Sequence, residues 1–111
     1  MNAIDDTERE TLLITGASSG LGYAIAAEAL KRGHRVVGTA RNIEKAAIGH
    51  PEFIQAGGKW LQIDLTDQDT QNVVGEVFER ENVTVLINNA GYGLYRALEY
   101  MRFAEPTTTV V

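Results

Sequence analysis

The amino-acid sequence predicts an α/β fold in which helices flank a parallel sheet. Three observations lead to this prediction: short apolar runs alternate with helical patterns, the alternation begins with a strand, and a glycine-rich turn joins the first strand to the first helix. Strands joined by helical crossovers pair in parallel, and such crossovers are right-handed. We expect the order βαβαβαβ, with a sheet truncated after about the fourth strand.

The first strand and the first helix have clear signals. Residues 12–14 form a continuous apolar run before Gly16, which is typical of a strand buried on both faces. A helix is predicted over residues 21–32, and Gly33 follows as its C-cap. Four residues of this helix lie at helical spacing, namely Leu21, Ala24, Ile25 and Ala29.

The later elements continue the alternation. In chain order we expect a strand over 35–39, helical turns over 43–48, a strand over 60–63, a helix with its N-cap at Thr66 and a strand over 83–87. The sequence Gly49-His50-Pro51 should end the helical turns. The buried face of the later helix should be Val73, Val74, Val77 and Phe78. After Gly93 the pattern fades into a possible helix over 94–103 and a β-prone end over 107–111.

Composition and charge narrow the classes of function. The chain has 111 residues, a net charge of −5 at pH 7 and no cysteine. An acidic protein is a poor partner for nucleic acid or an anionic membrane, and the lack of cysteine excludes disulfides and thiolate metal sites. We find neither a signal peptide nor a run approaching the roughly 20 apolar residues of a membrane span. A cytoplasmic protein is therefore the default expectation.

The glycine loop at residues 15–22, T-G-A-S-S-G-L-G, is the most informative feature. Gly16 permits a tight turn, Gly20 lets backbone amides approach a pyrophosphate, and Gly22 lets the helix pack close to the sheet. The helix start also presents N–H groups and a partial positive charge to phosphates. Glycine spacing alone would suit a structural turn equally well, but this position in a βαβ unit favours a nucleotide site.

Three motifs together resemble the short-chain dehydrogenase/reductase family. The loop at 15–22 matches the family signature T-G-x-x-x-G-x-G, and residues 88–91, N-N-A-G, match the motif after the fourth strand. Asp64-Leu65 lies where the family has an acidic residue that contacts adenine. The resemblance covers about residues 11–100 and implies the dinucleotide-binding half of a Rossmann-like fold.

Each of these residues also has a simpler interpretation. Asp64 could cap or solvate a strand end, and asparagine and glycine are common turn formers. In the family the N-N-A-G motif both braces the central sheet and lies against the adenosine ribose. We weigh these two roles equally here. Neither His34 nor His50 has a recognisable catalytic or metal partner, so both are expected in surface or loop roles.

The end of the second predicted strand favours NADP(H) over NAD(H). An NAD-selective site has an acid here for the ribose 2′-hydroxyl, whereas residues 38–42 read G-T-A-R-N. Arg41 offers a guanidinium suited to a 2′-phosphate, although an ordinary surface role stays open. Ser18 resembles a family position that helps to hold this phosphate. Ser19 stands where some NADP-preferring members carry a basic residue.

The catalytic half of the family pattern is missing. The family uses a serine and a Tyr-x-x-x-Lys pair, in which tyrosine is the general acid/base and lysine lowers its pKa. None of the four tyrosines is followed by lysine four positions later, and Tyr92 with Arg96 is the nearest imitation. From residue 101 onward the resemblance is lost. No residue is therefore assigned a catalytic or metal-binding role.

We expect a polar lead-in over 1–10, the dinucleotide-binding half of a Rossmann domain over 11–93 and a divergent tail over 94–111. The resemblance implies the NADP(H)-binding portion of an oxidoreductase acting on a carbonyl or secondary alcohol, inactive alone. The alternatives are a non-catalytic nucleotide-binding or interaction module and a non-functional truncated product. The residues expected to bind the cofactor are Gly16, Ser18, Ser19, Gly20, Leu21, Gly22, Arg41, Asp64, Leu65, Asn89, Ala90 and Gly91.

A truncated sheet would also expose an apolar edge. Without a fifth strand, residues 83–87 would offer unpaired backbone groups to a second copy of the chain. Self-association is therefore possible through this edge. Residues 107–111 are a segment that could cover this edge.

Overall fold

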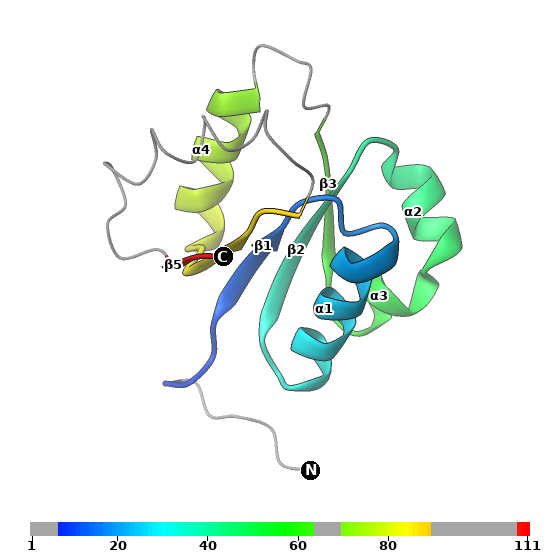
Figure 1. Ribbon diagram of the computed structural model, residues 1–111, viewed down its shortest axis with the longest axis horizontal. Coiled ribbons are helices and arrows are strands. Elements are labelled where there is room, and N and C mark those ends of the chain that lie inside the picture. Colours follow the sequence, from blue (N-terminus) through cyan, green and yellow to red (C-terminus); the bar gives the residue numbers. More distant parts are fainter. Residues whose placement is uncertain (1–6, 64–69, 90–108) are drawn as a thin grey trace.

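The computed structural model describes residues 7–63, 70–89 and 109–111. In this part of the chain five strands form one sheet in the order β3-β2-β1-β4-β5, and every neighbouring pair is parallel. Figure 1 shows α1, α2 and α3 on one side of the view and α4 on the other. The elements are β1 (Thr11–Ile14), α1 (Gly20–Lys31), β2 (Arg35–Ala40), α2 (Ile43–Gly49), α3 (Pro51–Gln55), β3 (Lys59–Gln62), α4 (Thr70–Glu81), β4 (Val85–Ile87) and β5 (Thr109–Val110). The predicted parallel α/β fold is confirmed.

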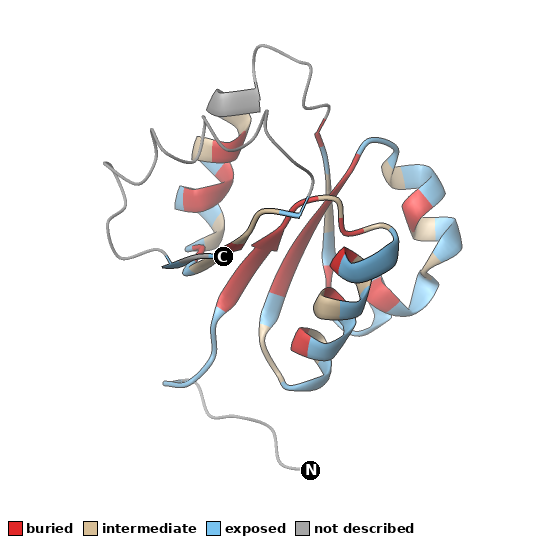
Figure 2. Ribbon diagram, in the orientation of Figure 1, coloured by how far each residue is buried: buried red, intermediate tan, exposed pale blue. Residues whose placement is uncertain are grey.

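The central strand β1 is buried on both faces, which explains its continuous apolar run. Leu13 packs with residues of α4 in one cluster, whereas Leu12 and Ile14 pack with residues of α1 and α3 in another. This alternation follows from the period of two along a strand. Figure 2 shows the resulting buried band through β1 and β2 between the two groups of helices. The sheet therefore holds two cores, one on each face.

Helix α1 approaches the sheet through small side chains. Its buried residues are Gly22, Ala26 and Ala29, so only Ala29 among the four residues at helical spacing is fully buried. Leu21 is instead 68% exposed. Small residues one turn apart let the helix backbone lie close to the strands, which a leucine in that position would prevent. The apolar spacing in the sequence thus predicted the helix correctly but did not predict which of its residues are buried.

A short helix, α3, begins where the sequence predicted only a break. Pro51 is at the start of this helix, where its missing N–H is not needed and its fixed φ suits the helix. Phe53 is 1% exposed and lies against Trp60, with 4.2 Å between ring centroids. A Cβ on Gly58 would lie 2.5 Å from the Phe53 ring. This aromatic contact anchors α3 beneath β3.

The end of the chain covers the edge of β4. Thr109 N–H donates to the Thr84 carbonyl at 2.9 Å, and Val111 N–H donates to the Leu86 carbonyl at 2.8 Å. Asn88 N–H in turn donates to the Val111 carbonyl at 3.0 Å. The described residues thus show a paired edge where the sequence raised the prospect of an open one and of self-association through it.

Some expected elements cannot be compared. The N-cap at Thr66 and the helix over 94–103 lie outside the described residues. Among the helices that the structure describes, none is both long enough and apolar enough to cross a membrane.

Replacing Val111 by proline tests whether β5 contributes to stability. The Val111 side chain is 71% exposed, so the main loss is the N–H donor to the Leu86 carbonyl. We expect Val111→Pro to lower the free energy of unfolding by about 1–2 kcal/mol in urea denaturation. Val111→Thr keeps the N–H and should match the unchanged chain. Equal stability of the two variants would show that this pairing contributes nothing.

Candidate functional site

The glycine loop lies at the carboxyl ends of the strands, between β1 and α1. Two of its glycines need their conformational freedom, because Gly16 has φ +62° and Gly20 has φ +58°. Residues with a Cβ rarely adopt this left-handed conformation. The ends of β2 and β4 lie on either side of the loop, because both strands pair with β1. Ligands of parallel α/β folds bind at this edge of the sheet.

Strand β2 holds the loop from one side. Gly16 N–H donates to Thr39 Oγ1 at 3.1 Å, and Ala17 N–H donates to the Thr39 carbonyl at 2.9 Å. Thr39 is buried, and the bond to its hydroxyl is partly shielded from solvent. A Cβ on Gly38 would lie 2.9 Å from the Ala17 Cβ, which leaves no room for a side chain there. The pair Gly38-Thr39 therefore fixes the start of the loop.

Strand β4 holds the loop from the other side. Thr15 N–H donates to the Ile87 carbonyl at 3.0 Å, and Asn89 N–H donates to Thr15 Oγ1 at 2.8 Å. The Asn89 side chain adds a third bond, from Nδ2 to the Gly16 carbonyl at 3.2 Å. Of the two roles that the sequence left open for Asn89, these contacts demonstrate the bracing one. A contact with an adenosine ribose stays a prediction.

Helix α1 begins against this brace. A Cβ on Gly22 would lie 2.5 Å from the Gly16 carbonyl oxygen and 2.6 Å from Asn89 Nδ2. By contrast, a Cβ on Gly20 would meet nothing within 4 Å. Ser19 is the N-cap but its side chain makes no capping bond, and no acid occupies the first turn. Among the described residues, the helix start therefore has open space beside Gly20 and no capping side chain, which fits an anion.

A cavity of about 660 Å³ adjoins the loop. It brings together the hydroxyl residues of the loop, two basic residues of the β2–α2 segment and the histidine between α2 and α3. Its lining residues are Ser18, Ser19, Arg41, Asn42, Lys45, Ala46, Gly49 and His50. Among these described residues none is acidic, so the cavity carries the positive charges of Arg41 and Lys45. Such a site suits an anion such as a phosphate.

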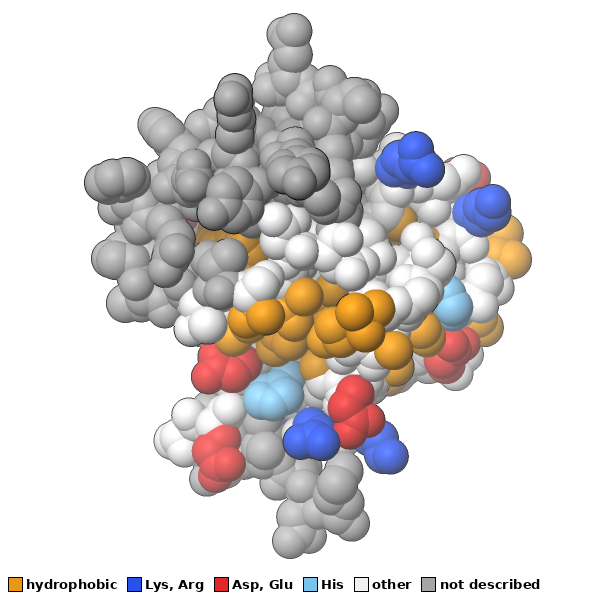
Figure 3. All heavy atoms as spheres, viewed as in Figure 1, with side chains coloured by type: hydrophobic (Ala, Val, Ile, Leu, Met, Phe, Trp, Pro, Cys, Tyr) orange, Lys and Arg blue, Asp and Glu red, His pale blue; other side chains and the backbone are white. Residues whose placement is uncertain are grey.

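Asn42 connects the two basic residues. Its side-chain Oδ1 accepts from Lys45 N–H at 3.1 Å and so caps the start of α2. This capping bond sets where α2 starts and brings Lys45 to the wall of the cavity that Arg41 also lines. Figure 3 shows that basic side chains on this face of the molecule form two separate groups.

His50 forms the wall of the cavity nearest the loop. Its Nε2 lies 2.8 Å from the Ser18 carbonyl oxygen, and its ring stacks on Tyr23 with 3.7 Å between centroids. The Tyr23 hydroxyl donates to Glu52 Oε1 at 2.5 Å. Burial, with help from this hydrogen bond, raises the pKa of Tyr23 to about 12. The same hydrogen bond lowers the pKa of the Glu52 carboxyl.

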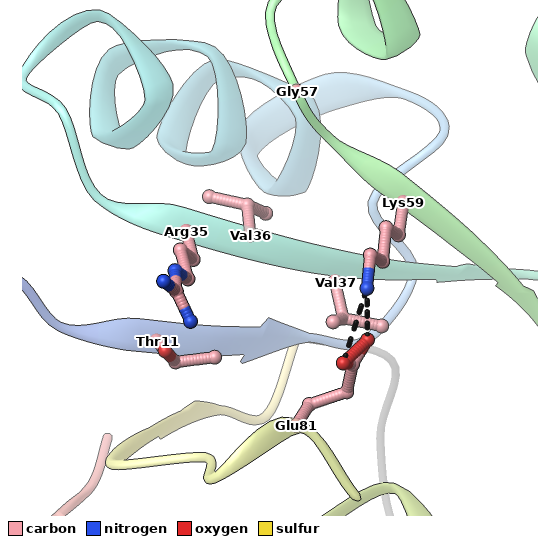
Figure 4. A pocket seen from close by; sticks show the side chains of 7 residues that line it. All are labelled: Thr11, Arg35, Val36, Val37, Gly57, Lys59 and Glu81. Atoms are coloured by element: carbon pink, nitrogen blue, oxygen red, sulfur yellow. Dashed lines mark hydrogen bonds and ion pairs between the residues drawn. The ribbon is translucent and has the colours of Figure 1, made fainter.

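A smaller cavity of about 200 Å³ lies at the opposite, amino-terminal edge of the sheet. Figure 4 shows its charged side chains, Arg35, Lys59 and Glu81, with Lys59 directed at Glu81. Lys59 Nζ is 2.6 Å from Glu81 Oε1, so much of its charge is already neutralised. Parallel α/β folds bind ligands at the opposite, carboxyl edge of the sheet. Basic residues at this amino-terminal edge are therefore suitable controls for variants of Arg41 and Lys45.

The structure shows where most of the predicted cofactor-binding residues lie, and their binding role stays a prediction. The loop residues Gly16, Ser18, Ser19, Gly20, Leu21 and Gly22, together with Arg41 and Asn89, lie at the carboxyl edge of the sheet. Ser18, Ser19 and Arg41 line one cavity. Asp64, Leu65, Ala90 and Gly91 lie outside the described residues.

Sequence reasoning missed Thr39, Asn42, Lys45 and the contacts of His50. For Lys45 a signal was present, because it lies in the first of the helical turns predicted over 43–48, only four positions after Arg41. For His50 no local signal exists, since its partner Ser18 is 32 positions away.

Replacing Gly22 by alanine tests the close approach of α1 to the loop. The new methyl group would collide with the Gly16 carbonyl and the Asn89 amide, so we expect a loss of about 1–3 kcal/mol in the free energy of unfolding. Gly75→Ala is the matched control, because a Cβ there meets nothing within 4 Å and Gly75 lies inside α4. That variant should gain about 0.5–1 kcal/mol in the same urea denaturation. Equal effects of the two changes would contradict the packing described here.

Comparisons with known proteins agree with the fold and identify the family of the chain. A family model described as short chain dehydrogenase matches residues 10–109. The chain is 46% identical over 90 residues to the oxidoreductase claN of Passalora fulva, covering 80% of this chain and 41% of that protein. It also resembles a crystal structure of a short-chain dehydrogenase from Streptomyces avermitilis, with a TM-score of 0.76 and 29% identity over 96% of this chain and 49% of that one.

A second solved structure is informative about ligands. It is a variant of actinorhodin polyketide ketoreductase with NADPH, and the likeness has a TM-score of 0.75 and 25% identity, covering 96% of this chain and 53% of that one. The chain thus spans between 41% and 53% of the length of these three proteins.

Proposed function

The chain belongs to the short-chain dehydrogenase family, whose members bind a nicotinamide dinucleotide, and we propose that it binds NADP(H) in preference to NAD(H). One observation carries the preference. Arg41 and Lys45 line a single cavity with Ser18 and Ser19 of the glycine loop, and no acidic residue is among those described around it.

The residues present fit the two anionic parts of this cofactor. The pyrophosphate would lie at the start of α1, beside the open side of Gly20, where Ser19 leaves the amides without a capping side chain. The 2′-phosphate would lie in the cavity, within reach of the Arg41 guanidinium, the Lys45 ammonium and the Ser18 hydroxyl. We extend the proposal to adenine contacts from Asp64 and Leu65 and ribose contacts from Asn89, Ala90 and Gly91.

The positive charge of the cavity would favour NADP(H) over NAD(H). An acid at the end of β2 would accept from a ribose 2′-hydroxyl and repel a 2′-phosphate, but β2 ends with Ala40 and is followed by Arg41. NAD(H) would leave both basic residues without an anion. The NADPH in the similar ketoreductase structure supports the same choice.

Replacing Arg41 by alanine tests the preference. Loss of a charge-assisted contact should weaken NADPH binding by about 1.5–3 kcal/mol and leave NADH binding nearly unchanged. Lys45→Ala should act in the same direction. Isothermal titration calorimetry with both cofactors measures these effects.

The matched control for this experiment is Arg35→Ala. It removes the same charge from the opposite edge of the sheet and should change neither dissociation constant. If Arg41→Ala weakens both cofactors equally, or if Arg35→Ala has the same effect, the assignment of the 2′-phosphate to this cavity is wrong.

We further propose that the chain is the nucleotide-binding portion of an oxidoreductase acting on a carbonyl or a secondary alcohol. When bound, the reduced cofactor would give a hydride to a carbonyl, or the oxidised cofactor would accept one from a secondary alcohol. The residues seen in this structure bind and orient it. Within the 111 residues no tyrosine is followed four positions later by lysine, so the general acid/base pair of the family is absent. The chain alone would therefore bind the cofactor without turnover.

A purified chain should accordingly bind NADPH and show no oxidation of it above the enzyme-free rate with simple ketones, followed by NADPH absorbance. Binding is measured in the same samples by cofactor fluorescence. NADPH oxidation that depends on both chain and ketone would refute the view that the chain is inactive alone. A chain that neither binds NADPH nor unfolds cooperatively would instead support the non-functional product.

A further inference from the structure

We propose that Tyr23 and His50 are positioning residues for the 2′-phosphate site, which act through the Ser18 carbonyl and fix α2 against the glycine loop. The inference rests on the proposed NADP(H) site. Ser18 of the loop and Lys45 of α2 both line the basic cavity. The contacts that fix α2 relative to the loop therefore decide whether one phosphate can contact both residues.

The start of α2 is held by contacts that do not involve the glycine loop. Asn42 Oδ1 accepts from Lys45 N–H at 3.1 Å. The side chain of Gln62, at the end of β3, accepts from Ile43 N–H at 3.3 Å. Ala46, in the middle of the helix, is buried. These contacts attach α2 to the sheet and leave its position relative to the loop to other groups.

The side chain of His50 joins the end of α2 to the glycine loop. His50 directly follows α2, and its Nε2 lies 2.8 Å from the Ser18 carbonyl oxygen, although 32 positions separate the two residues. A carbonyl oxygen can only accept, so Nε2 is the donor. The neutral ring protonated on Nε2 and the imidazolium both supply this donor, so the contact does not depend on the charge of His50.

Tyr23 fixes the orientation of the His50 ring. The two rings are stacked, with 3.7 Å between centroids and an interplanar angle of 17°. The Tyr23 hydroxyl donates to Glu52 Oε1 of α3, and His50 Nδ1 lies 3.5 Å from the same oxygen. A ring that is stacked on one face and contacted at its edge has little rotational freedom, so its donor is pre-organised toward Ser18.

The start of α1 is held independently of His50. Asn89 Nδ2 donates to the Gly16 carbonyl, and Gly22 of α1 lies against both of these groups. The proposed pyrophosphate site, which either cofactor would use, therefore stays in place without the His50–Ser18 hydrogen bond. That bond aligns the loop with α2, and the 2′-phosphate would lie between them. Its loss should weaken binding of NADP(H) more than binding of NAD(H).

The first test compares His50→Ala with His50→Gln by isothermal titration calorimetry. Loss of one hydrogen bond in His50→Ala should weaken NADPH binding about threefold to tenfold, with less than about a twofold change for NADH. Glutamine can place an N–H donor near the position of Nε2, so His50→Gln should bind NADPH within about twofold of the unchanged chain.

His34→Ala is the matched control. His34 Nδ1 accepts from Glu10 N–H at 2.9 Å, next to the start of β2 at the amino-terminal edge of the sheet. This variant therefore also loses one hydrogen bond between an imidazole and the backbone. It should change the dissociation constant of neither cofactor.

Tyr23→Leu tests whether Tyr23 acts through His50. Removal of the stacked ring should weaken NADPH binding selectively, and by less than His50→Ala does. The double variant should bind NADPH as His50→Ala does, because two residues that act through one contact have non-additive effects. Additive losses in the double variant would show that Tyr23 has no part in positioning His50.

The Ser18 carbonyl reports the hydrogen bond directly, without any cofactor. Its ¹³C signal should move in His50→Ala and return toward its original position in His50→Gln. An unmoved signal in His50→Ala would overturn the inference. Equal weakening of NADPH and NADH, or failure of His50→Gln to restore NADPH binding, would also overturn it. If the unchanged chain binds NADPH and NADH equally, the proposed function is wrong and the inference falls with it, although the carbonyl signal would still show whether the contact exists.

Discussion

The close approach of the β1–α1 turn to both neighbouring strands is the constraint on which the rest of the site depends. Thr39 of β2 accepts and Asn89 after β4 donates hydrogen bonds that hold the backbone of Gly16 from two sides. Gly22 stands where any side chain would overlap the Gly16 carbonyl and the Asn89 amide. A movement of the turn backbone, or a side chain at Gly22, would therefore break its contacts with β2 and with Asn89.

Two consequences for the site follow from this anchoring. Because α1 meets the sheet through Gly22, Ala26 and Ala29, its first turn lies directly above the strand ends, with open space beside Gly20. Because β2 is drawn against the loop, the residues that follow it lie beside Ser18 and form a basic cavity with it. The start of α1 and the basic cavity are thus adjacent parts of one surface.

The sequence allowed prediction of those features that depend on local backbone chemistry. The tight turn at Gly16, the doubly buried β1 and the parallel pairing of the first four strands could all be anticipated. The buried face of α1 could not, because contact with the sheet selects small residues and leaves Leu21 exposed. Helix α3 was missed because a proline that ends one helix also suits the first turn of the next.

Residues whose role depends on distant partners were the hardest to predict. His50 reads as a loop residue until folding brings it to the Ser18 carbonyl, and Lys45 reads as a surface cation until Arg41 is seen beside the same cavity. Strand β5 is short, and although residues 107–111 are β-prone, its pairing depends on the distant edge that β4 offers.

The central claim is that a phosphate-bearing dinucleotide binds at the carboxyl edge of the sheet, and backbone NMR of the isotope-labelled chain titrated with NADP⁺ tests it most directly. We expect the amide signals of Ser18, Ser19, Gly20 and Arg41 to shift, while those of Arg35 and Lys59 at the opposite edge stay in place. Shifts centred on Arg35 and Lys59, or no shift in the glycine loop at saturating NADP⁺, would contradict it.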